Sequence, residues 1–478
     1  MSAISNAKWN LISQLAKLSS QFINLFVLSR ILAPSDYGLM GMVYVVTNFG
    51  LLLKDMGTTA AIIQDKQITA SKIEAVFWFN IFVGMFLFLI VTLSSSFIAA
   101  FFSQPALKEF LIISALIFPI SSLTAIHQAL LEKESKFNIV ARIELISILV
   151  AVIVAVAMAL NGYGVYSLVI QAILTVLLTS LQLLFSFKWK PVFSFDYSEF
   201  KTLFIFSSNM TGFQIVTYAF RNLDTVIIGK FFGPATLGFY SIASKIMLLP
   251  IQNISWIAAR SLYPVMSKSQ EDNEYLKSLF LKTLGFIAFF TAPTMVGIFV
   301  LKEEFINLIL GSKWAPVAEM LGYLAPVGFF MSILGILTTV LMAKGKANFL
   351  LLTSSFAAVI HFICFYVGIR LAGINGLICG YLIATLLSAL LPLSLVFKLL
   401  DIKPAEWLII VMRVIAIALF MGIVVRVADQ FLIKQIVNNQ IIILITDAFV
   451  GISIYFLLVR LFIKQKLEYL KKMIKRNP

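Results

Sequence analysis

Polar side chains recur at every third or fourth position in two hydrophobic segments that lie 200 residues apart. This spacing places the polar groups of each segment on one face of a helix. The face must contact protein or water, because polar groups lose their hydrogen-bond partners in lipid. Two interpretations stay open: hydrogen bonds that fix helix packing, and a wet cavity lined from both segments. The first stripe comprises Asn10, Gln14, Lys17, Gln21 and Asn24, and the second comprises Ser207, Thr211, Gln214, Tyr218, Arg221 and Asp224 or Thr225.

Deep cationic side chains outnumber deep acidic ones along the chain. Guanidinium and ammonium groups bind phosphate oxygens most strongly where water is scarce. We therefore expect a cavity for a substrate that carries phosphate or acidic sugars. Its candidate binding residues are the cations Lys17, Lys54, Arg221 and Lys245 and the polar residues Gln14, Gln21, Asn24 and Gln214.

Two acidic residues lie beside these cations. Asp224 follows Arg221 by three positions, so the two can form an ion pair that serves only helix packing. Alternatively, Arg221 binds an anionic ligand and Asp224 carries a proton or a cation. Asp55 directly follows Lys54, and neighbours on one helix point in different directions. Asp55 is therefore a second coupling-ion candidate, and which of the pair faces the cavity stays open.

Motifs for other kinds of chemistry are missing from the sequence. It contains no HExxH, GxxxxGK[ST], CxxC or GxSxG pattern, so we expect no metal, no cofactor and no ATP hydrolysis by this chain. Cys364 and Cys379 fall inside hydrophobic segments, where we expect packing residues and no disulfide. His361 is open to two interpretations, a proton relay or a packing residue. An ion gradient of H⁺ or Na⁺ is the expected source of energy.

The composition predicts a membrane protein. Of the 478 residues 60% are hydrophobic and 12% are charged, whereas about a quarter of an ordinary soluble domain is charged. A helix needs about 20 apolar residues to span the membrane, and the alternating pattern of a barrel strand is not seen. Fourteen helical spans are expected, at roughly 9–32, 38–63, 75–100, 110–131, 143–160, 163–187, 204–229, 238–262, 279–301, 320–343, 349–371, 376–397, 408–425 and 441–462.

An internal repeat organises these spans. Arg30–Pro34 and Gly38 reappear as Lys230–Pro234 and Gly238, 200 residues later. Fainter matches follow in the same order, at the ends of spans four and ten and at the starts of spans six and twelve. Such repeats with polar groups at matching depths are typical of transporters with a central binding site.

The repeat predicts an all-α fold of two six-helix lobes. A pseudo-twofold axis along the membrane normal should relate the lobes, since each has an even number of spans. The net charge of +15 agrees with a membrane topology in which both termini are cytoplasmic, because most Lys and Arg then lie inside. The expected parts are a first lobe at 1–187, a cytoplasmic linker at 188–203, a second lobe at 204–400, and two additional helices with a basic tail at 401–478.

Several stretches resemble the signature of bacterial polysaccharide flippases. Tyr37–Met42 and Leu53–Gln64 resemble the second-helix signature of that family, and Asn222–Gly233 with Leu237–Ser241 resemble its seventh and eighth helices. Tyr263–Ser267 matches the end of the same region. The resemblance covers nearly the whole chain. It is strongest to the colanic-acid-exporter branch of the multidrug/oligosaccharidyl-lipid/polysaccharide exporter superfamily.

The resemblance implies a flippase of the bacterial inner membrane that is not an enzyme. Such a protein moves an undecaprenyl-pyrophosphate-linked oligosaccharide to the outer leaflet by alternating access, for surface polysaccharide export. Membrane lipids and polysaccharide polymerase or assembly proteins are candidate partners, and no nucleic-acid partner is expected. Two rivals remain. A cation-coupled multidrug exporter would need a cavity rich in carboxylates, and a membrane enzyme would need a sizeable outer loop.

Overall fold

The computed structural model describes residues 9, 14, 18–55, 59, 62–63, 69–186, 189, 191–192, 214–215, 217–433 and 439–462. These residues form helices joined by short turns, and they contain no strand. Ten of the described helices are long and apolar enough to cross a membrane, or eleven if one bent pair counts as a single span. The all-α expectation is confirmed. Residues 10–13 and 15–17 of the first span, the start of the seventh and the basic tail at 463–478 lie outside the described residues.

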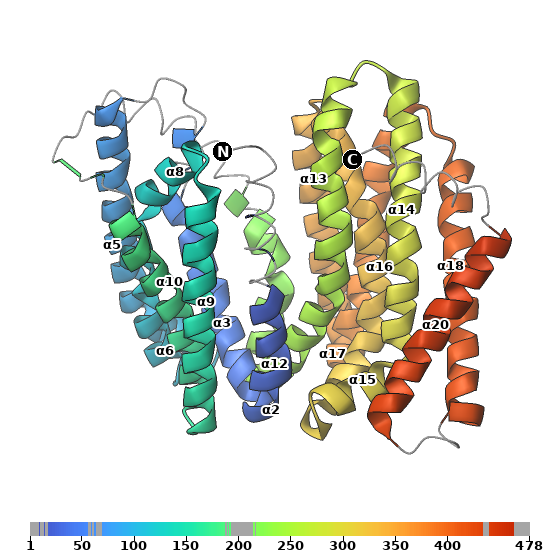
Figure 1. Ribbon diagram of the computed structural model, residues 1–478, viewed down its shortest axis with the longest axis horizontal. Helices are drawn as coiled ribbons and strands as arrows, with labels where there is room; N and C mark the ends of the chain where they lie inside the picture. Colours follow the sequence, from blue (N-terminus) through green and yellow to red (C-terminus); the bar gives the residue numbers. More distant parts are fainter. Residues whose placement is uncertain are drawn as a thin grey trace. The chain divides into compact units, whose positions relative to one another are not determined.

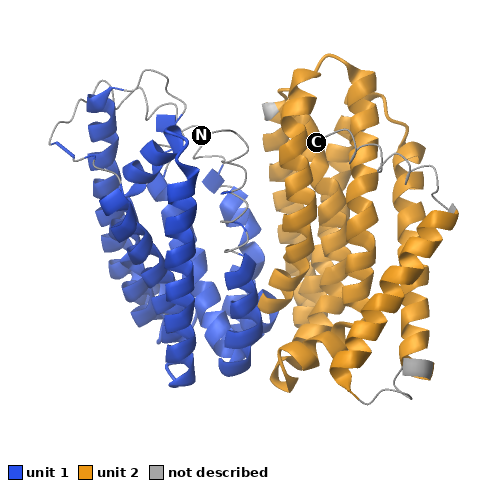
Figure 2. Cartoon of the chain, viewed as in Figure 1, with its two compact units in different colours: residues 1–241 blue, residues 242–478 orange. Residues whose placement is uncertain are grey.

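The chain forms two compact units, residues 1–241 and 242–478 (Figure 2). The boundary falls inside α12, so residues 217–241 belong to the first unit. The expected division at the 188–203 linker stays a prediction, since most of those residues lie outside the described ones. Trp189 and Val192 are described, and both contact the first unit: Trp189 packs on Phe77, and the Val192 carbonyl accepts from Trp78 Nε1 at 3.0 Å.

The first unit is a bundle in which helices next to each other in sequence pack side by side, as α9 and α10 do (Figure 1). Its helices have continuous apolar faces interrupted by small and polar residues at contacts between helices. Their bounds are η1 Asn24–Leu28, α2 Ser29–Ile31, α3 Pro34–Asp55, α5 Ala70–Phe101, α6 Leu107–Ala115, α7 Ile117–Ser122, α8 Ala125–Lys133, α9 Phe137–Leu160, α10 Val165–Ser186 and the first part of α12 Leu223–Pro250.

The predicted span at 110–131 is bent. It consists of α6, α7 and α8, with a turn of 44° between Ser122 and Ala125. Pro119 lies inside α7, and proline removes a backbone donor and interrupts a helix. The hydroxyls of Thr124 and Ser180 are 3.0 Å apart, and Ser180 Oγ donates to the carbonyl of Ile120 at 3.2 Å. These hydroxyls supply polar partners for the backbone at the bend.

The second unit contains the remaining helices. Its core is the contact of α14 with α16 and α18, and α16 also packs on α13 and α17. The bounds are η2 Ile251–Ser255, α13 Trp256–Lys268, α14 Asn273–Val300, α15 Lys302–Ile309, η3 Ser312–Trp314, α16 Ala315–Ala343, α17 Ala347–Leu400, α18 Pro404–Ala428, η4 Asp429–Ile433 and α20 Gln440–Phe462.

Two of the long helices each contain a break where a turn between spans was expected. In α12 the break is at Gly233, whose φ is 79°, and in α17 it is at Gly373, whose φ is 57°. Only glycine adopts this left-handed region without steric cost. Each of these long helices therefore contains the sharp reversal that the sequence placed between two neighbouring spans.

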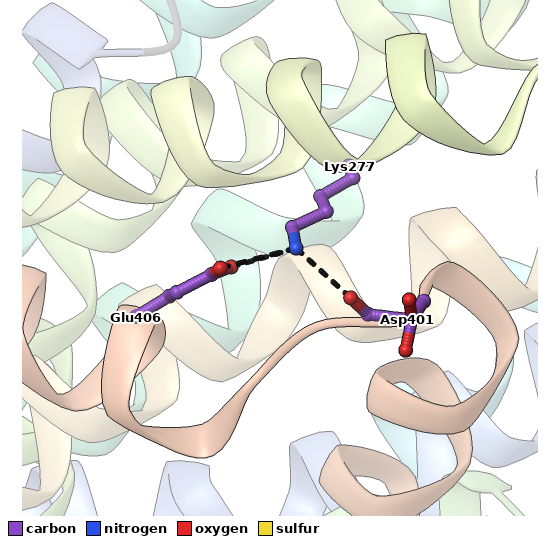
Figure 3. A network of polar contacts seen from close by, with 3 residues as sticks. All are labelled: Lys277, Asp401 and Glu406. Carbon is purple, nitrogen blue, oxygen red and sulfur yellow. Dashed lines mark hydrogen bonds and ion pairs between the residues drawn. The ribbon is translucent and has the colours of Figure 1, made fainter.

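A polar cluster attaches the first additional helix to the second unit (Figure 3). Lys277 of α14 donates to the carbonyl of Asp401 at 2.9 Å and pairs with Glu406 of α18 at 2.9 Å. The side chains of Lys277 and Glu406 remain about a third exposed, at 27% and 36%. The extra helices are thus packed on the same unit as spans nine to twelve.

The repeat is visible in the local backbone. At the end of α8 the amide of Lys136 donates to Leu131 O at 2.9 Å, and at the end of α16 the amide of Lys346 donates to Leu341 O at 2.9 Å. The residues before them, Ser135 and Gly345, have φ angles of 55° and 66°. Both turns are helix C-caps with the same hydrogen-bond pattern, in which a residue with a positive φ angle ends the helix.

Candidate functional site

Lys54 is a buried cation on the last turn of α3. Its side chain is 8% exposed, and Nζ donates to Ser121 Oγ of α7 at 3.1 Å. Ser121 Oγ in turn donates to the carbonyl of Phe118 at 3.1 Å. Gly50 permits the close approach, because a Cβ there would overlap the ring of Phe118. Among the described residues Lys54 forms no ion pair, and its hydrogen-bond partner is a neutral hydroxyl.

Asp55 points elsewhere. Its side chain is exposed and accepts a hydrogen bond from Thr59 Oγ1 at 2.6 Å, one turn along the chain. Neighbouring positions on a helix differ in direction by about 100°. Lys54 is therefore buried in the first unit and Asp55 is exposed, and which of the two faces a cavity stays a prediction.

Asp224 is held by hydroxyl and amide donors from its own unit. Its carboxylate accepts from the hydroxyl of Tyr240, and also from Thr225 N at 2.6 Å and Thr225 Oγ1 at 3.3 Å. Arg221 is exposed, and it forms no ion pair among the described residues. The ion pair that would have served only packing is therefore not formed.

The predicted seventh span contacts α3 just before α12 begins. Tyr218 lies in the helical residues 217–221, and its hydroxyl donates to the carbonyl of Val45 at 2.8 Å. The rings of Tyr218 and Phe49 are 5.7 Å apart. Tyr218 thus lies against the second half of α3, which ends at Asp55.

The polar stripe of the first helix divides into two groups. Asn24 is half-buried: its Oδ1 accepts from Gln171 Nε2 of α10 at 3.0 Å, and its carbonyl accepts from the Tyr37 hydroxyl at 2.6 Å. Its side chain therefore serves contacts between helices in this state. Gln14 and Gln21 are exposed. Lys17 lies outside the described residues.

Two more of the expected residues, Gln214 and Lys245, are exposed, Gln214 in the first unit and Lys245 in the second. Lys54, Arg221 and Asp224 share the first unit but form no hydrogen bond or ion pair with one another. The role of all these residues in binding stays a prediction.

Sequence reasoning missed the partners of the charged residues. Ser121 was not considered, although Pro119 and the polar run Ser121–Thr124 inside an apolar span are signals of a break. Tyr240 was noted only as part of a motif, although it is the group that binds Asp224. The break at Gly233 brings Asp224 and Tyr240 together. A contact across a turn between two helices leaves no periodic pattern in the sequence.

The two histidines pack against aromatic rings, and the two cysteines form no disulfide. His361 Nδ1 lies 2.7 Å from the carbonyl of Ala357, and its ring packs edge-to-face on Phe365 and Tyr381. His127 is 2% exposed and packs edge-to-face on Trp189. Cys364 and Cys379 are free, as the sequence predicted.

Comparison with known proteins shows the family to which the chain belongs. Residues 27–319 match the family described as polysaccharide biosynthesis protein. The chain belongs to this polysaccharide biosynthesis protein family. An uncharacterized membrane protein in the cps region of Klebsiella pneumoniae is 30% identical over 83% of each chain. Teichuronic acid biosynthesis protein TuaB of Bacillus subtilis is 26% identical over 88% of each chain.

A solved structure has the same fold as this chain. The structure of lipid II flippase MurJ in its inward closed conformation superposes with a TM-score of 0.76, covering 97% of this chain and 100% of MurJ. Sequence identity is 16%, so the likeness concerns the fold. The chain therefore has the fold of MurJ, and its long apolar helices make it a multi-pass membrane protein.

Proposed function

We propose that this protein is a flippase that moves a lipid-linked oligosaccharide from the cytoplasmic to the outer leaflet of the bacterial inner membrane. The proposed substrate is an undecaprenyl-pyrophosphate-linked repeat unit for surface polysaccharide. The observation that carries this proposal is Lys54, a buried ammonium whose hydrogen-bond partner is the neutral hydroxyl of Ser121. A buried charge without an opposite charge is costly, and a phosphate oxygen would offset that cost.

Family membership supports the same class of substrate. TuaB, with which this chain shares 26% identity, is named for teichuronic acid biosynthesis. The fold shared with MurJ is that of a protein whose name states that it flips lipid II. Both names refer to envelope polymers or their lipid-linked precursors. We infer that translocation here involves no covalent chemistry and that both termini are cytoplasmic.

The proposed site joins cations from several helices. Lys54 and Arg221 are the residues that we assign to the phosphates, with Lys17 and Lys245 as further candidates. Gln14, Gln21, Asn24 and Gln214 are assigned to the polar wall that receives the glycan. Asp224 is the preferred coupling-ion residue, with Asp55 second. Among the described residues, Asp224 offers a carboxylate next to two hydroxyls, which suits transient binding of H⁺ or Na⁺.

The rival function is a multidrug exporter of the same superfamily. A cationic drug would need a free carboxylate in the cavity, but Asp224 is occupied by three donors and Asp55 is directed away from Lys54. Loss of the gene would then sensitise cells to cationic drugs without changing surface polysaccharide. If the protein is a flippase, loss of the gene should change surface polysaccharide without sensitising cells to cationic drugs.

The decisive experiment is complementation of a strain that lacks the gene. The intact chain should restore surface polysaccharide, and Lys54→Gln should fail while lipid-linked oligosaccharide accumulates on the cytoplasmic side. Lys136→Gln is the matched control, because Lys136 is 45% exposed and pairs with Glu134 at 2.6 Å. Normal export by Lys54→Gln at normal abundance would remove Lys54 from the site.

A further inference from the structure

The two additional helices, α18 and α20, are attached to the second unit at several levels. The start of α18 is held by the polar cluster of Figure 3, and Arg426 near its other end lies 3.6 Å from the carboxylate of Glu304 of α15. Between these levels, Tyr455 of α20 donates its hydroxyl to the carbonyl of Phe289 of α14 at 2.8 Å. Both helices therefore turn a buried face toward α14.

The opposite faces of α18 and α20 are apolar and exposed. On α18, Ile409, Phe420 and Ile423 are 58%, 53% and 62% exposed. On α20, Ile452 and Phe456 are 58% and 50% exposed. Within each helix these residues recur at helical spacing, so they form one stripe along it. Such a stripe on a membrane helix suits contact with lipid acyl chains, which are as apolar as the side chains.

One arginine interrupts each stripe. Arg413 follows Ile409 by four residues, and Arg460 follows Phe456 by four. Both are exposed, and neither forms a hydrogen bond or an ion pair with another described residue. Arg413 lies nine residues after Pro404, where α18 begins, which is about 14 Å along the helix axis. A cation on a lipid-facing surface at this depth is costly unless it reaches an anion or water.

The two arginines lie at about the same depth. A Cβ on Gly451 of α20 would lie 3.2 Å from Val425 Cγ2 and 3.9 Å from Met421 Sδ of α18, so the helices cross there. They run in opposite directions (Figure 1). Arg460 follows Gly451 by nine residues, and Arg413 precedes Met421 by eight. Both are therefore about 12–14 Å from the crossing on the same side, which is the cytoplasmic side in the proposed topology.

We propose that Arg413 and Arg460 form a binding site for an anionic phospholipid of the cytoplasmic leaflet. The lipid phosphate accepts hydrogen bonds from the guanidinium groups, and the acyl chains lie along the apolar stripes of α18 and α20. Arginine binds phosphate oxygens with two parallel hydrogen bonds, and basic positions on the cytoplasmic side of membrane helices attract anionic headgroups. The site goes beyond the proposed function, because its ligand is not the transported molecule.

Lipid binding to the purified full chain tests the site. The protein in a neutral detergent is titrated with phosphatidylglycerol, which is anionic, or with phosphatidylcholine, which is zwitterionic. Native mass spectrometry counts the bound lipid, and tryptophan fluorescence follows the thermal denaturation midpoint. Phosphatidylglycerol should stay bound and raise the midpoint, because it binds the folded chain. Phosphatidylcholine should do neither at the same concentration.

Three glutamine variants assign the effect to the two arginines. Arg413→Gln and Arg460→Gln should each weaken phosphatidylglycerol binding about fivefold, which is the contribution of one arginine near an anionic headgroup. The double variant should weaken it more than either single change. Arg370→Gln is the matched control and should bind as the intact chain does. Arg370 is likewise exposed on a membrane helix, and it lies 5.5 Å from the ring centre of Tyr366 of α17.

Each contrary result has its own meaning. Equal binding of the two lipids to the intact chain would overturn the site, and so would unchanged affinity in the folded double variant. Inorganic phosphate is the third probe: an equal rise of the midpoint that the double variant loses would show a site for a free anion and not for a lipid. A dimer that the double variant dissociates, measured by light scattering, would make this face an interface between two copies.

The single variants decide the matter if the double variant does not fold. Either one should bind phosphatidylglycerol more weakly than Arg370→Gln at equal abundance, and equal binding would overturn the proposal. No measurement here involves export, so failure of the lipid site leaves the proposed function unaffected.

Discussion

Tyr240 donates its phenolic hydroxyl to the carboxylate of Asp224 across the break at Gly233. The two residues belong to consecutive predicted spans of the first unit. Thr225 supplies two further donors to the same carboxylate. The arrangement stabilises a charged Asp224, since a carboxylate accepts hydrogen bonds more strongly than a protonated acid does.

We expect Asp224→Asn to abolish polysaccharide export at normal abundance, because an amide cannot exchange a proton or neutralise a cation. Tyr240→Phe should lower export, since a hydrogen bond to a charged group contributes about 1.5–3 kcal/mol. Surface polysaccharide and protein abundance are measured together. Normal export by Asp224→Asn at normal abundance would remove Asp224 from the proposed site.

Lys54→Met should lose export while keeping or raising the thermal denaturation midpoint. Methionine retains the length of the side chain and removes a buried charge that has no carboxylate partner in the described chain. The midpoint is measured in detergent by the fluorescence of buried tryptophans. A large fall in the midpoint would instead assign Lys54 a structural role, with Ser121 as its essential partner.

Arg221→Ala should abolish export without changing protein abundance. The side chain is exposed and has no ion-pair partner among the described residues, so its removal leaves no buried group unsatisfied. Arg221→Lys should retain partial activity, because lysine keeps the charge but loses the two-pronged geometry of the guanidinium. Normal surface polysaccharide in Arg221→Ala would remove this residue from the substrate site.

The Lys277–Glu406 pair should contribute to stability and leave the substrate site unaffected. Lys277→Glu or Glu406→Lys alone should lower the denaturation midpoint, by an amount equivalent to about 1 kcal/mol or less for a partly exposed pair. The combined exchange should recover most of the loss. Failure of the exchange to recover stability would indicate that the Asp401 carbonyl, and not Glu406, is the important acceptor.

His361→Phe should preserve export and its pH profile. The imidazole packs edge-to-face on Phe365 and Tyr381, and a phenyl ring fills the same space. A proton relay at this position would be lost in the variant. Export measured between pH 6 and pH 8 therefore separates a packing residue from a relay, and a flattened or lost activity would restore the relay interpretation.

Much of the fold follows from periodicity and repetition. The hydrophobic spacing predicted the helices, and the matching of residues 34 and 38 with 234 and 238 marked a repeat whose copies are in direct contact. The bend between Ser122 and Ala125 was not predicted, because the hydropathy of 110–131 is continuous through Pro119. Hydropathy indicates which residues lie within the membrane, but it says little about where the axis of a helix bends.

The site was less predictable for the same reason. The charged residues were found from their unfavourable depth, but their partners depend on helix rotation. Asn24 contacts Gln171, which lies 147 positions further along the chain. The burial of Lys54 and the exposure of Asp55 depend on how α3 packs on α7, where Gly50 lies against the ring of Phe118. Local spacing cannot encode either relationship.

The hydroxyl of Tyr218 rests on a carbonyl inside α3, that of Val45. A main-chain oxygen within a helix already accepts an amide proton and has a second lone pair to spare. When the phenol leaves, this oxygen keeps its helical bond, and only the hydroxyl must find a water molecule. The hydrogen bond from Tyr218 to Val45 contributes about 1 kcal/mol to the contact between α3 and the seventh span. Breaking this hydrogen bond therefore leaves no buried backbone group without a partner.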